Sequence, residues 1–207
     1  MITTRLARLL VPPTCAACCS PCEPDRSICP SCVRDLDLSG PIVGPDIPGI
    51  ERIRSVAPHS GVGRSILAAY KFGGLVGLAP FIASRMSEVA PGAGDSGCVV
   101  PVPAARFRQR LRGFDTAEDL ARLLSGWTGW PLRTGSLVRA GHGRQRGKGR
   151  NTRLADPPVI EAREKHEGTV LVVDDVVTTG ATLTTCARSL RGSGASRVLA
   201  VTFTRRV

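Results

Sequence analysis

The chain has 207 residues, of which 42% are hydrophobic, and a formal net charge of +11 from 28 Lys and Arg against 17 Asp and Glu. This length holds one domain of ordinary size with a small additional segment and excludes two large domains, and no apolar run is long enough for a membrane span. The positive charge suits a polyanionic partner, either nucleic acid or a phosphorylated small molecule, although a coding bias towards Arg would produce the same balance.

The N-terminal segment is rich in cysteine. Six of the eight cysteines lie within residues 15–32, among Pro and Ser and with almost no large apolar residue, so the segment cannot build a core of its own. Two Cys-x-x-Cys pairs are separated by ten residues. This spacing allows four thiolates to bind one structural Zn²⁺, and the predicted ligands are Cys15, Cys18, Cys29 and Cys32.

The same cysteines allow other interpretations. Cys19 and Cys22 form a competing Cys-x-x-Cys pair, so the spacing alone does not decide which four thiols bind a metal. Disulfides and an iron–sulfur cluster are the alternatives to zinc. Residues 1–14 contain too short an apolar stretch for a signal peptide, so we expect a cytoplasmic protein, in which disulfides are disfavoured.

A linker rich in Pro and Gly follows at residues 39–49 and places a domain boundary near residue 45, between a cysteine-rich segment (1–45) and a main domain (46–207). In the main domain we predict strands at residues 50–57, 98–102, 170–173 and 197–204. Helices are predicted at residues 62–72, 75–89, 115–125 and 181–191, with Pro80 inside the second, and a loop at residues 139–153. The alternation predicts an α/β fold with a mostly parallel sheet flanked by helices.

Two aspartates follow the predicted strand at residues 170–173. That strand is a continuous apolar run, as expected for a strand buried on both faces of a parallel sheet. We therefore expect Asp174 and Asp175 to project from its carboxyl end, where open α/β sheets bind their ligands. Two neighbouring carboxylates can accept hydrogen bonds from the cis-diol of a ribose.

The turn after the aspartates leads into a helix and consists of Thr178, Thr179, Gly180, Ala181 and Thr182. Gly180 lets the backbone approach a ligand closely, and the amides and dipole of a helix N-terminus favour an anion. The stretch thus predicts a sugar-phosphate site, with ribose on the aspartates and a 5′-phosphate on the turn. The alternative is structural, with the aspartates capping the strand and the threonines the helix.

Residues 170–183 resemble the signature of type I phosphoribosyltransferases, which bind 5-phosphoribosyl 1-diphosphate (PRPP). The resemblance implies that the basic loop after the strand at 98–102 binds the pyrophosphate leaving group, through Arg112 and Gly113 and with help from Arg106, Arg108 and Arg110. A solvated basic face is the alternative for each arginine. Enzymes for hypoxanthine and guanine usually carry Asp where this chain has Thr178, which makes those acceptors less expected.

The order of motifs along the chain resembles the ComF family, whose members join a zinc-binding segment to a phosphoribosyltransferase domain and are associated with DNA uptake in competence. The motifs are the cysteine cluster, YKFGG from residue 70, PVP from 101, RGF from 112, a loop with Gln145, Gly147, Arg150 and Arg153, and VVDDVVTTGAT from 172. The family usually has Asn and Gln after RGF, where this chain has Asp115 and Thr116, and its Asn after the second loop arginine falls at Asp156.

These resemblances imply an enzyme that displaces pyrophosphate from PRPP, with Asp174, Asp175 and Arg112 as catalytic residues. They also imply Mg²⁺ as a cofactor that accompanies PRPP, and they leave the acceptor unidentified. Two alternatives stay open. One is a competence accessory protein that binds single-stranded DNA and acts with competence or recombination proteins, and the other is a sensor that binds PRPP without turnover.

Overall fold

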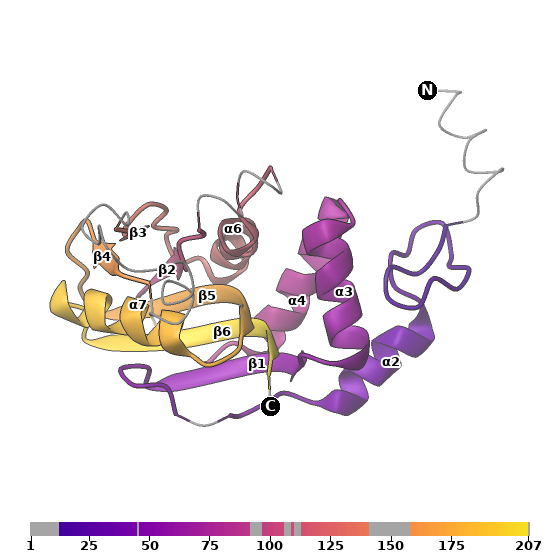
Figure 1. The fold of residues 1–207 in the computed structure, drawn as a ribbon, viewed down its shortest axis with the longest axis horizontal. Helices are drawn as coiled ribbons and strands as arrows, with labels where there is room; N and C mark the ends of the chain where they lie inside the picture. Colours follow the sequence, from indigo (N-terminus) through magenta and orange to yellow (C-terminus); the bar gives the residue numbers. More distant parts are fainter. Residues whose placement is uncertain are drawn as a thin grey trace, which may run out of the picture.

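A four-stranded parallel sheet forms the centre of the protein (Figure 1). The computed structural model describes residues 13–44, 46–91, 97–105, 109, 113–140 and 158–206. The strands lie in the order β1-β6-β5-β2, and each neighbouring pair is parallel. Their bounds are β1 (Arg52–Pro58), β2 (Gly97–Pro101), β5 (Thr169–Val177) and β6 (Arg197–Arg205). The predicted α/β architecture with a parallel sheet is confirmed.

Helices cover both faces of this sheet. One face contacts α3 (Gly61–Phe72), α4 (Ala79–Val89) and α6 (Thr116–Thr128). The other face contacts α7 (Ala181–Gly192), which lies in front of β5 and β6 in Figure 1. A separate antiparallel pair of short strands, β3 (Leu137–Arg139) and β4 (Ile160–Ala162), packs beside α7. Within the described ranges, no helix combines the length and the apolar character that crossing a membrane requires.

β5 contributes to the core on both of its faces. Leu171 and Val173 belong to the apolar cluster under α3, α4 and α6, whereas Val170 and Val172 belong to the cluster under α7. Successive side chains of a strand point to opposite faces, so a strand covered on both sides needs an unbroken apolar run. This is the physical reason why the sequence TVLVV forms the central part of the sheet.

The predicted elements of the main domain are present, with small shifts at most of their ends and two larger changes. β5 continues to Val177, four residues beyond the predicted end of that strand. The helix predicted over residues 75–89 is divided into a short 3₁₀ helix, η1 (Val76–Leu78), and α4, which begins at Ala79. Pro80 therefore lies in the first turn of α4 and not in a helix interior. The first turn suits proline because its missing N–H has no partner within the helix there.

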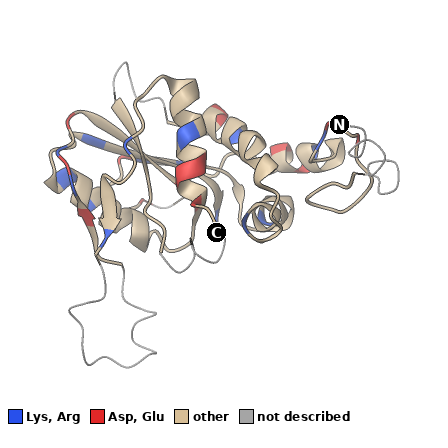
Figure 2. Cartoon of the chain, turned by 90° about the horizontal axis from the view of Figure 1, so that it is seen from above, with Lys and Arg blue, Asp and Glu red and all other residues tan. Residues whose placement is uncertain are grey.

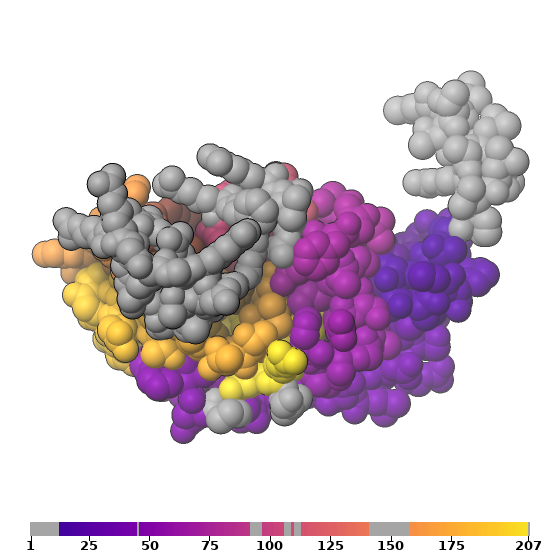
Figure 3. Space-filling view, in the orientation of Figure 1, coloured from indigo at the N-terminus to yellow at the C-terminus, as the bar shows by residue number. Residues whose placement is uncertain are grey.

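The cysteine-rich segment packs against the main domain. Its helix is α2 (Pro30–Ser39), and Ile28 and Leu36 join the same buried apolar cluster as the side chains of α3 and α4. An ion pair of 2.7 Å joins Arg85 Nη2 on α4 to Asp37 Oδ1 on α2. Figure 3 shows the segment in contact with the neighbouring helices. The predicted boundary near residue 45 stays a prediction, because position 45 is outside the described residues.

Candidate functional site

The two neighbouring aspartates lie within β5 and point to opposite faces of the sheet. β5 continues to Val177, so neither residue stands beyond the end of the strand. Asp175 shares the face of Val173, which α3 and α6 cover, and Asp174 shares the face of Val172, which α7 covers. The expectation that both carboxylates project together from the strand end is therefore wrong, because the pleat of the strand separates them.

Asp175 is a buried carboxylate with partners from two helices. Its side chain is 7% exposed, and Lys71 Nζ at the end of α3 lies 2.5 Å from its Oδ1. Its Oδ2 accepts a hydrogen bond from the hydroxyl of Thr116, the first residue of α6. A buried charge is stable only when it is paired and hydrogen-bonded, and these two contacts supply both conditions. The interior position of Asp175 thus has a local cause.

Asp174 lies next to the predicted phosphate-binding turn. Its carboxylate accepts a hydrogen bond of 2.9 Å from the backbone N–H of Asp175. Burial, and then the negative charge of Asp175, raise the pKa of Asp174 to about 8, although the positive charges of Lys71 and Arg139 act in the opposite direction. Asp174 is among the residues that line a small hollow of about 40 Å³, together with residues 176–183. Asp174 is therefore the member of the pair that lies beside the turn.

The N-terminus of α7 begins at a glycine. Gly180 is the N-cap residue at φ +78° and has no side chain to cap the helix, and Thr179 Oγ1 accepts a long hydrogen bond of 3.4 Å from the N–H of Ala181. Thr178, Thr179 and Ala181 are exposed, whereas Gly180 is buried against Ile47, whose Cδ1 would lie 3.0 Å from an added Cβ. Beyond this long contact of Ala181, the N-terminus of α7 can attract an anion, and both the left-handed backbone and the close contact favour glycine at position 180.

Two short motifs that are distant in sequence meet beside Asp175. In YKF, the Tyr70 hydroxyl donates a hydrogen bond of 2.6 Å to Asp119 Oδ2, and Lys71 binds Asp175. The Tyr70 ring packs against Phe114 of RGF, with 5.3 Å between ring centroids. These contacts tie α3 to α6 at the carboxyl end of β5. Sequence reasoning missed the role of Lys71, and the only signal was its place in a motif used as a family marker.

The two residues after RGF begin α6. Asp115 is the N-cap residue, and its Oδ1 accepts hydrogen bonds from the N–H groups of Ala117 (3.0 Å) and Glu118 (3.3 Å). Thr116 then binds Asp175, as described above. Asp115 and Thr116 stand where the family usually has Asn and Gln. In this chain Asp115 caps α6 and Thr116 binds Asp175.

Several predicted site residues lie outside the described part of the chain. Arg112 is among them, as are Arg106, Arg108, Arg110 and the loop from Gln145 to Arg153 with Asp156. Gly113 is described and has φ +81°. The described residues carry 17 Lys and Arg against 15 Asp and Glu, a net charge of +2, and Figure 2 shows both signs intermixed on them. The remaining +9 of the net charge belongs to segments that are not described.

Four cysteines come together in the N-terminal segment. The ligand atoms of Cys15, Cys18, Cys29 and Cys32 all lie within 4.8 Å of one another, and Cys18 Sγ is 3.7 Å from Cys29 Sγ. Four thiolates around a tetrahedral Zn²⁺ would lie ~3.8 Å apart, given a Zn–S distance of ~2.3 Å. The observed cluster can therefore hold a zinc ion. These are the four predicted ligands, and Cys19 and Cys22 are not part of the cluster.

Hydrogen bonds already prepare part of this cluster for metal binding. A hydrogen bond from Ser31, followed by the backbone of Cys32, lowers the pKa of the Cys29 thiol to about 6. The backbone N–H groups of Ala17 and Cys29 both point at Cys15 Sγ, at 3.4 and 3.3 Å. Burial raises the pKa of Cys32 well above its usual range, as expected for a thiol that lacks a positive partner. A bound cation would supply that partner.

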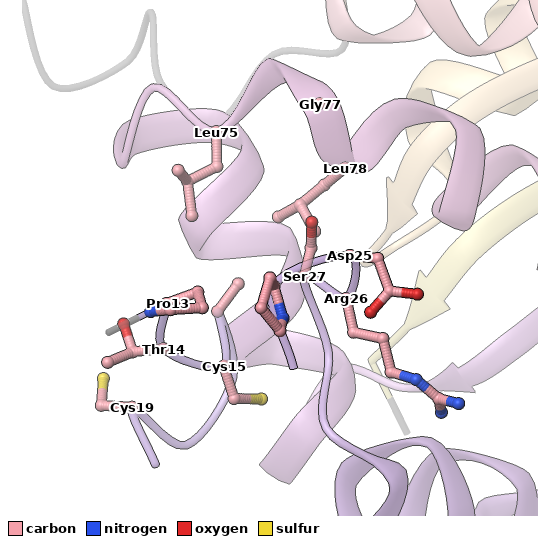
Figure 4. A pocket seen from close by; sticks show the side chains of 12 residues that line it. Pro13, Thr14, Cys15, Cys19, Asp25, Arg26, Ser27, Leu75, Gly77 and Leu78 are labelled. Atoms are coloured by element: carbon pink, nitrogen blue, oxygen red, sulfur yellow. The ribbon is translucent and has the colours of Figure 1, made fainter. Parts of the chain in front are cut away.

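Two larger cavities lie away from the acidic pair. One of about 630 Å³ separates the cysteine segment from η1 and is lined by Cys15, Cys19, Leu75 and Leu78 among others (Figure 4). A second, of about 590 Å³, lies between β4 and α7. Neither contains a paired carboxylate or an uncapped helix start. We therefore place the candidate site at Asp174 and the turn, where the chemistry of a sugar phosphate is present despite the smaller hollow.

Comparison with known proteins supports this placement. Residues 112–206 match the family described as phosphoribosyl transferase domain, a stretch that contains Asp174, Asp175 and the whole turn. Residues 112–206 are therefore similar to phosphoribosyl transferase domains. The chain is 33% identical to Competence protein F of Haemophilus influenzae over 106 residues. The aligned stretch covers 48% of this chain and 46% of that protein.

A second relative is Competence protein ComFC of Bacillus subtilis, which is 30% identical over 148 residues, or 68% of this chain and 58% of that protein. The chain spans about half the length of these curated relatives. With the four-cysteine cluster, these matches confirm the resemblance to the ComF family.

Solved structures also show similarity, at low sequence identity. The purine phosphoribosyltransferase of Pyrococcus horikoshii has a TM-score of 0.35 and 18% identity, covering 66% of this chain and 84% of that one. The adenine phosphoribosyltransferase of Leishmania tarentolae has a TM-score of 0.35 and 16% identity, over 67% and 59% of the two chains. Because both scores are below 0.5, we draw nothing about function from these two structures.

Proposed function

We propose that the protein binds PRPP at the carboxyl end of β5 and transfers its phosphoribosyl group to an acceptor of unidentified class. The observation that carries the proposal is the position of Asp174 beside the start of α7, where the N-cap residue is a glycine. The match of residues 112–206 to phosphoribosyl transferase domains supports it, because both parts of the site lie in that stretch. The +9 charge of the segments outside the described residues also suits a ligand with several phosphates.

Each part of the site has a role in this proposal. The amides of the turn and the hydroxyls of Thr178, Thr179 and Thr182 bind the 5′-phosphate, and Asp174 accepts a hydrogen bond from the ribose. Arg112 and the backbone of Gly113 would bind the pyrophosphate, and Mg²⁺ that arrives with PRPP would supply further positive charge there. The acceptor forms a bond to the anomeric carbon while the bond from that carbon to the pyrophosphate oxygen breaks.

Calorimetry with PRPP and Mg²⁺ on the zinc-loaded protein tests binding directly. We expect saturable one-site binding that Asp174→Asn weakens. A matched control is Asp46→Asn, since Asp46 is an exposed carboxylate in the linker before β1. Absence of PRPP binding by the unmodified protein would contradict the proposal, and so would equal binding by Asp174→Asn.

Turnover separates an enzyme from a PRPP sensor. Release of pyrophosphate is measured with PRPP, Mg²⁺ and panels of nucleobases, amines and nucleotides as acceptors. An enzyme releases pyrophosphate faster with one acceptor than with none, and Asp174→Asn abolishes the difference. A sensor binds PRPP with the same dependence on Asp174 but releases no pyrophosphate with any acceptor.

Binding of single-stranded DNA is the second candidate function. The observation in its favour is the charge at residues 106–112 and 141–157, which together contain nine Arg or Lys and one Asp. The names of the two relatives, both competence proteins, point in the same direction. A salt titration tests this candidate, because affinity carried by phosphate contacts falls steeply as salt rises. Binding that ignores salt would contradict it.

A further inference from the structure

The cavity of about 630 Å³ between the cysteine-rich segment and η1 is a groove with apolar walls (Figure 4). Leu75 and Leu78 line it from the main domain, and Pro13 and Pro24 line it from the cysteine-rich segment. Leu75 is 47% exposed, and its neighbour Val76 is 54% exposed. Exposed apolar side chains that adjoin one another beside a cavity are typical of an interaction surface.

The groove also carries a carboxylate without a cationic partner. Asp25 lines the groove beside Arg26, but Arg26 Nε pairs with Glu23 Oε2 at 2.6 Å. Within the part of the chain that the structure describes, Asp25 forms no ion pair of its own. The groove therefore suits an apolar segment that carries a positive charge at the border of its apolar face.

Residues 1–12 lie outside the described residues, and their sequence has both of these properties. At the helical period of 3.6 residues, four apolar residues share one face: Ile2, Leu6, Leu9 and Leu10. Arg5 falls at the border of that face, whereas Thr4 and Arg8 fall opposite it. A stretch of ten residues forms little helix in water by itself, so this pattern indicates a helix that needs a surface to pack against.

The first described residue lies on the groove itself. Pro13 is one of the lining residues, and its carbonyl oxygen accepts a hydrogen bond of 2.8 Å from the N–H of Cys22. Residues 1–12 are therefore joined to a fixed point on the groove, and ten helical residues span ~15 Å. Because the tether is so short, the effective concentration of this segment at the groove is high.

We propose that residues 2–11 bind in this groove of the same chain as an amphipathic helix, with their leucines against η1 and Arg5 beside Asp25. The helix supplies apolar contacts to a segment that cannot build a core of its own. It also covers Leu75, which is otherwise half exposed. Its binding requires no PRPP and is therefore independent of the proposed function.

Amide hydrogen exchange of the full-length, zinc-loaded protein tests this docking. We expect slow exchange at residues 2–11. Leu6→Gln with Leu9→Gln should speed exchange there and at residues 75–78 by at least ~10-fold, because two apolar side chains leave the contact. The matched control is Thr4→Gln with Arg8→Gln, which changes the opposite face and should leave both rates unchanged. Elemental analysis checks that each variant keeps its metal.

Cross-linking identifies the occupant of the groove without a polar substitution. With the photoreactive residue p-benzoylphenylalanine in place of Leu9, we expect a cross-link to residues 75–78 within one chain, at a yield that does not depend on protein concentration. A cross-link between chains would assign the groove to a second copy and overturn the proposal. Fast exchange at residues 2–11 in the unmodified protein would also overturn it, as would equal effects of the two double variants.

Discussion

The cysteine cluster and the acidic pair are both prominent in the sequence, but their side chains are arranged differently in the structure. Four cysteines spread over residues 15–32 have their thiols within 4.8 Å of one another. Asp174 and Asp175 are adjacent, yet their carboxylates lie on opposite faces of β5. Distance along the chain therefore says little about distance between functional groups. Spacing has predictive value only together with the backbone geometry that the spacing implies.

The physical difference lies in what holds each set of groups. A tight turn between two cysteines returns their side chains to one point, and a metal ion demands that arrangement. A strand does the reverse, because its pleat sends successive side chains apart. Asp175 could stay inside only because Lys71 and Thr116 reach it from distant parts of the chain.

The largest effect is expected at the cysteine cluster. Structural zinc in a segment with little core contributes on the order of 10 kcal/mol, so Cys15→Ser or a strong chelator should remove the metal and unfold this segment. Metal content by elemental analysis and the thermal unfolding profile check this outcome. The control is Cys19→Ser, which should keep the metal, since Cys19 is not part of the cluster. Loss of metal in the control would contradict the predicted ligand set.

The second effect concerns the buried ion pair. Lys71→Met should lower the free energy of unfolding by about 3 to 5 kcal/mol, because it leaves the charge of Asp175 buried and unpaired. Denaturation by urea measures the change. The double variant Lys71→Met with Asp175→Asn removes both charges and should recover part of the loss. If the loss in the double variant equals the sum of the losses in the two single variants, Lys71 and Asp175 are not energetically coupled.

The third effect is expected at the turn. Gly180→Ala should cost about 1 to 2 kcal/mol of stability, because φ is +78° and the new Cβ would lie 3.0 Å from Ile47. The variant should also weaken PRPP binding by moving the first amides of α7. Gly126→Ala is the matched control, since this exposed glycine of α6 has nothing within 4 Å and alanine should stabilise the helix by up to ~1 kcal/mol. Equal effects of the two changes would contradict the assigned strain.

The smallest effect is a pH dependence. Folding raises the pKa of Asp174 from 3.8 to about 8, so the folded state binds the proton more tightly and stability falls as pH rises between these values. Asp174→Asn stays neutral at both pH values, so its stability relative to the unmodified protein should be greater at pH 9 than at pH 5. Thermal unfolding at the two pH values measures the gain. Residues of a binding site often lower the stability of the folded protein, so replacing one of them can stabilise it.

Much of the fold follows from local sequence patterns. The apolar run before Asp174, the helical spacing of Ile66, Leu67 and Tyr70, and the turn at Gly180 each predict an element that the structure contains. Pro80 shows where local rules need context, because its place at the start of α4 depends on the short η1 that precedes it. Lys71 could not be assigned from sequence, because its partner is 104 residues away.

The sequence by itself determined the fold class of this protein, an α/β domain with a glycine turn after an acidic pair, and a cysteine segment whose spacing suits a metal site. These features depend on neighbouring residues, whose geometry the backbone fixes locally. Only the tertiary structure decided which aspartate faces the turn. That outcome depends on the two helices packed against one face of β5, whose Lys71 and Thr116 make the burial of Asp175 stable and leave Asp174 at the site.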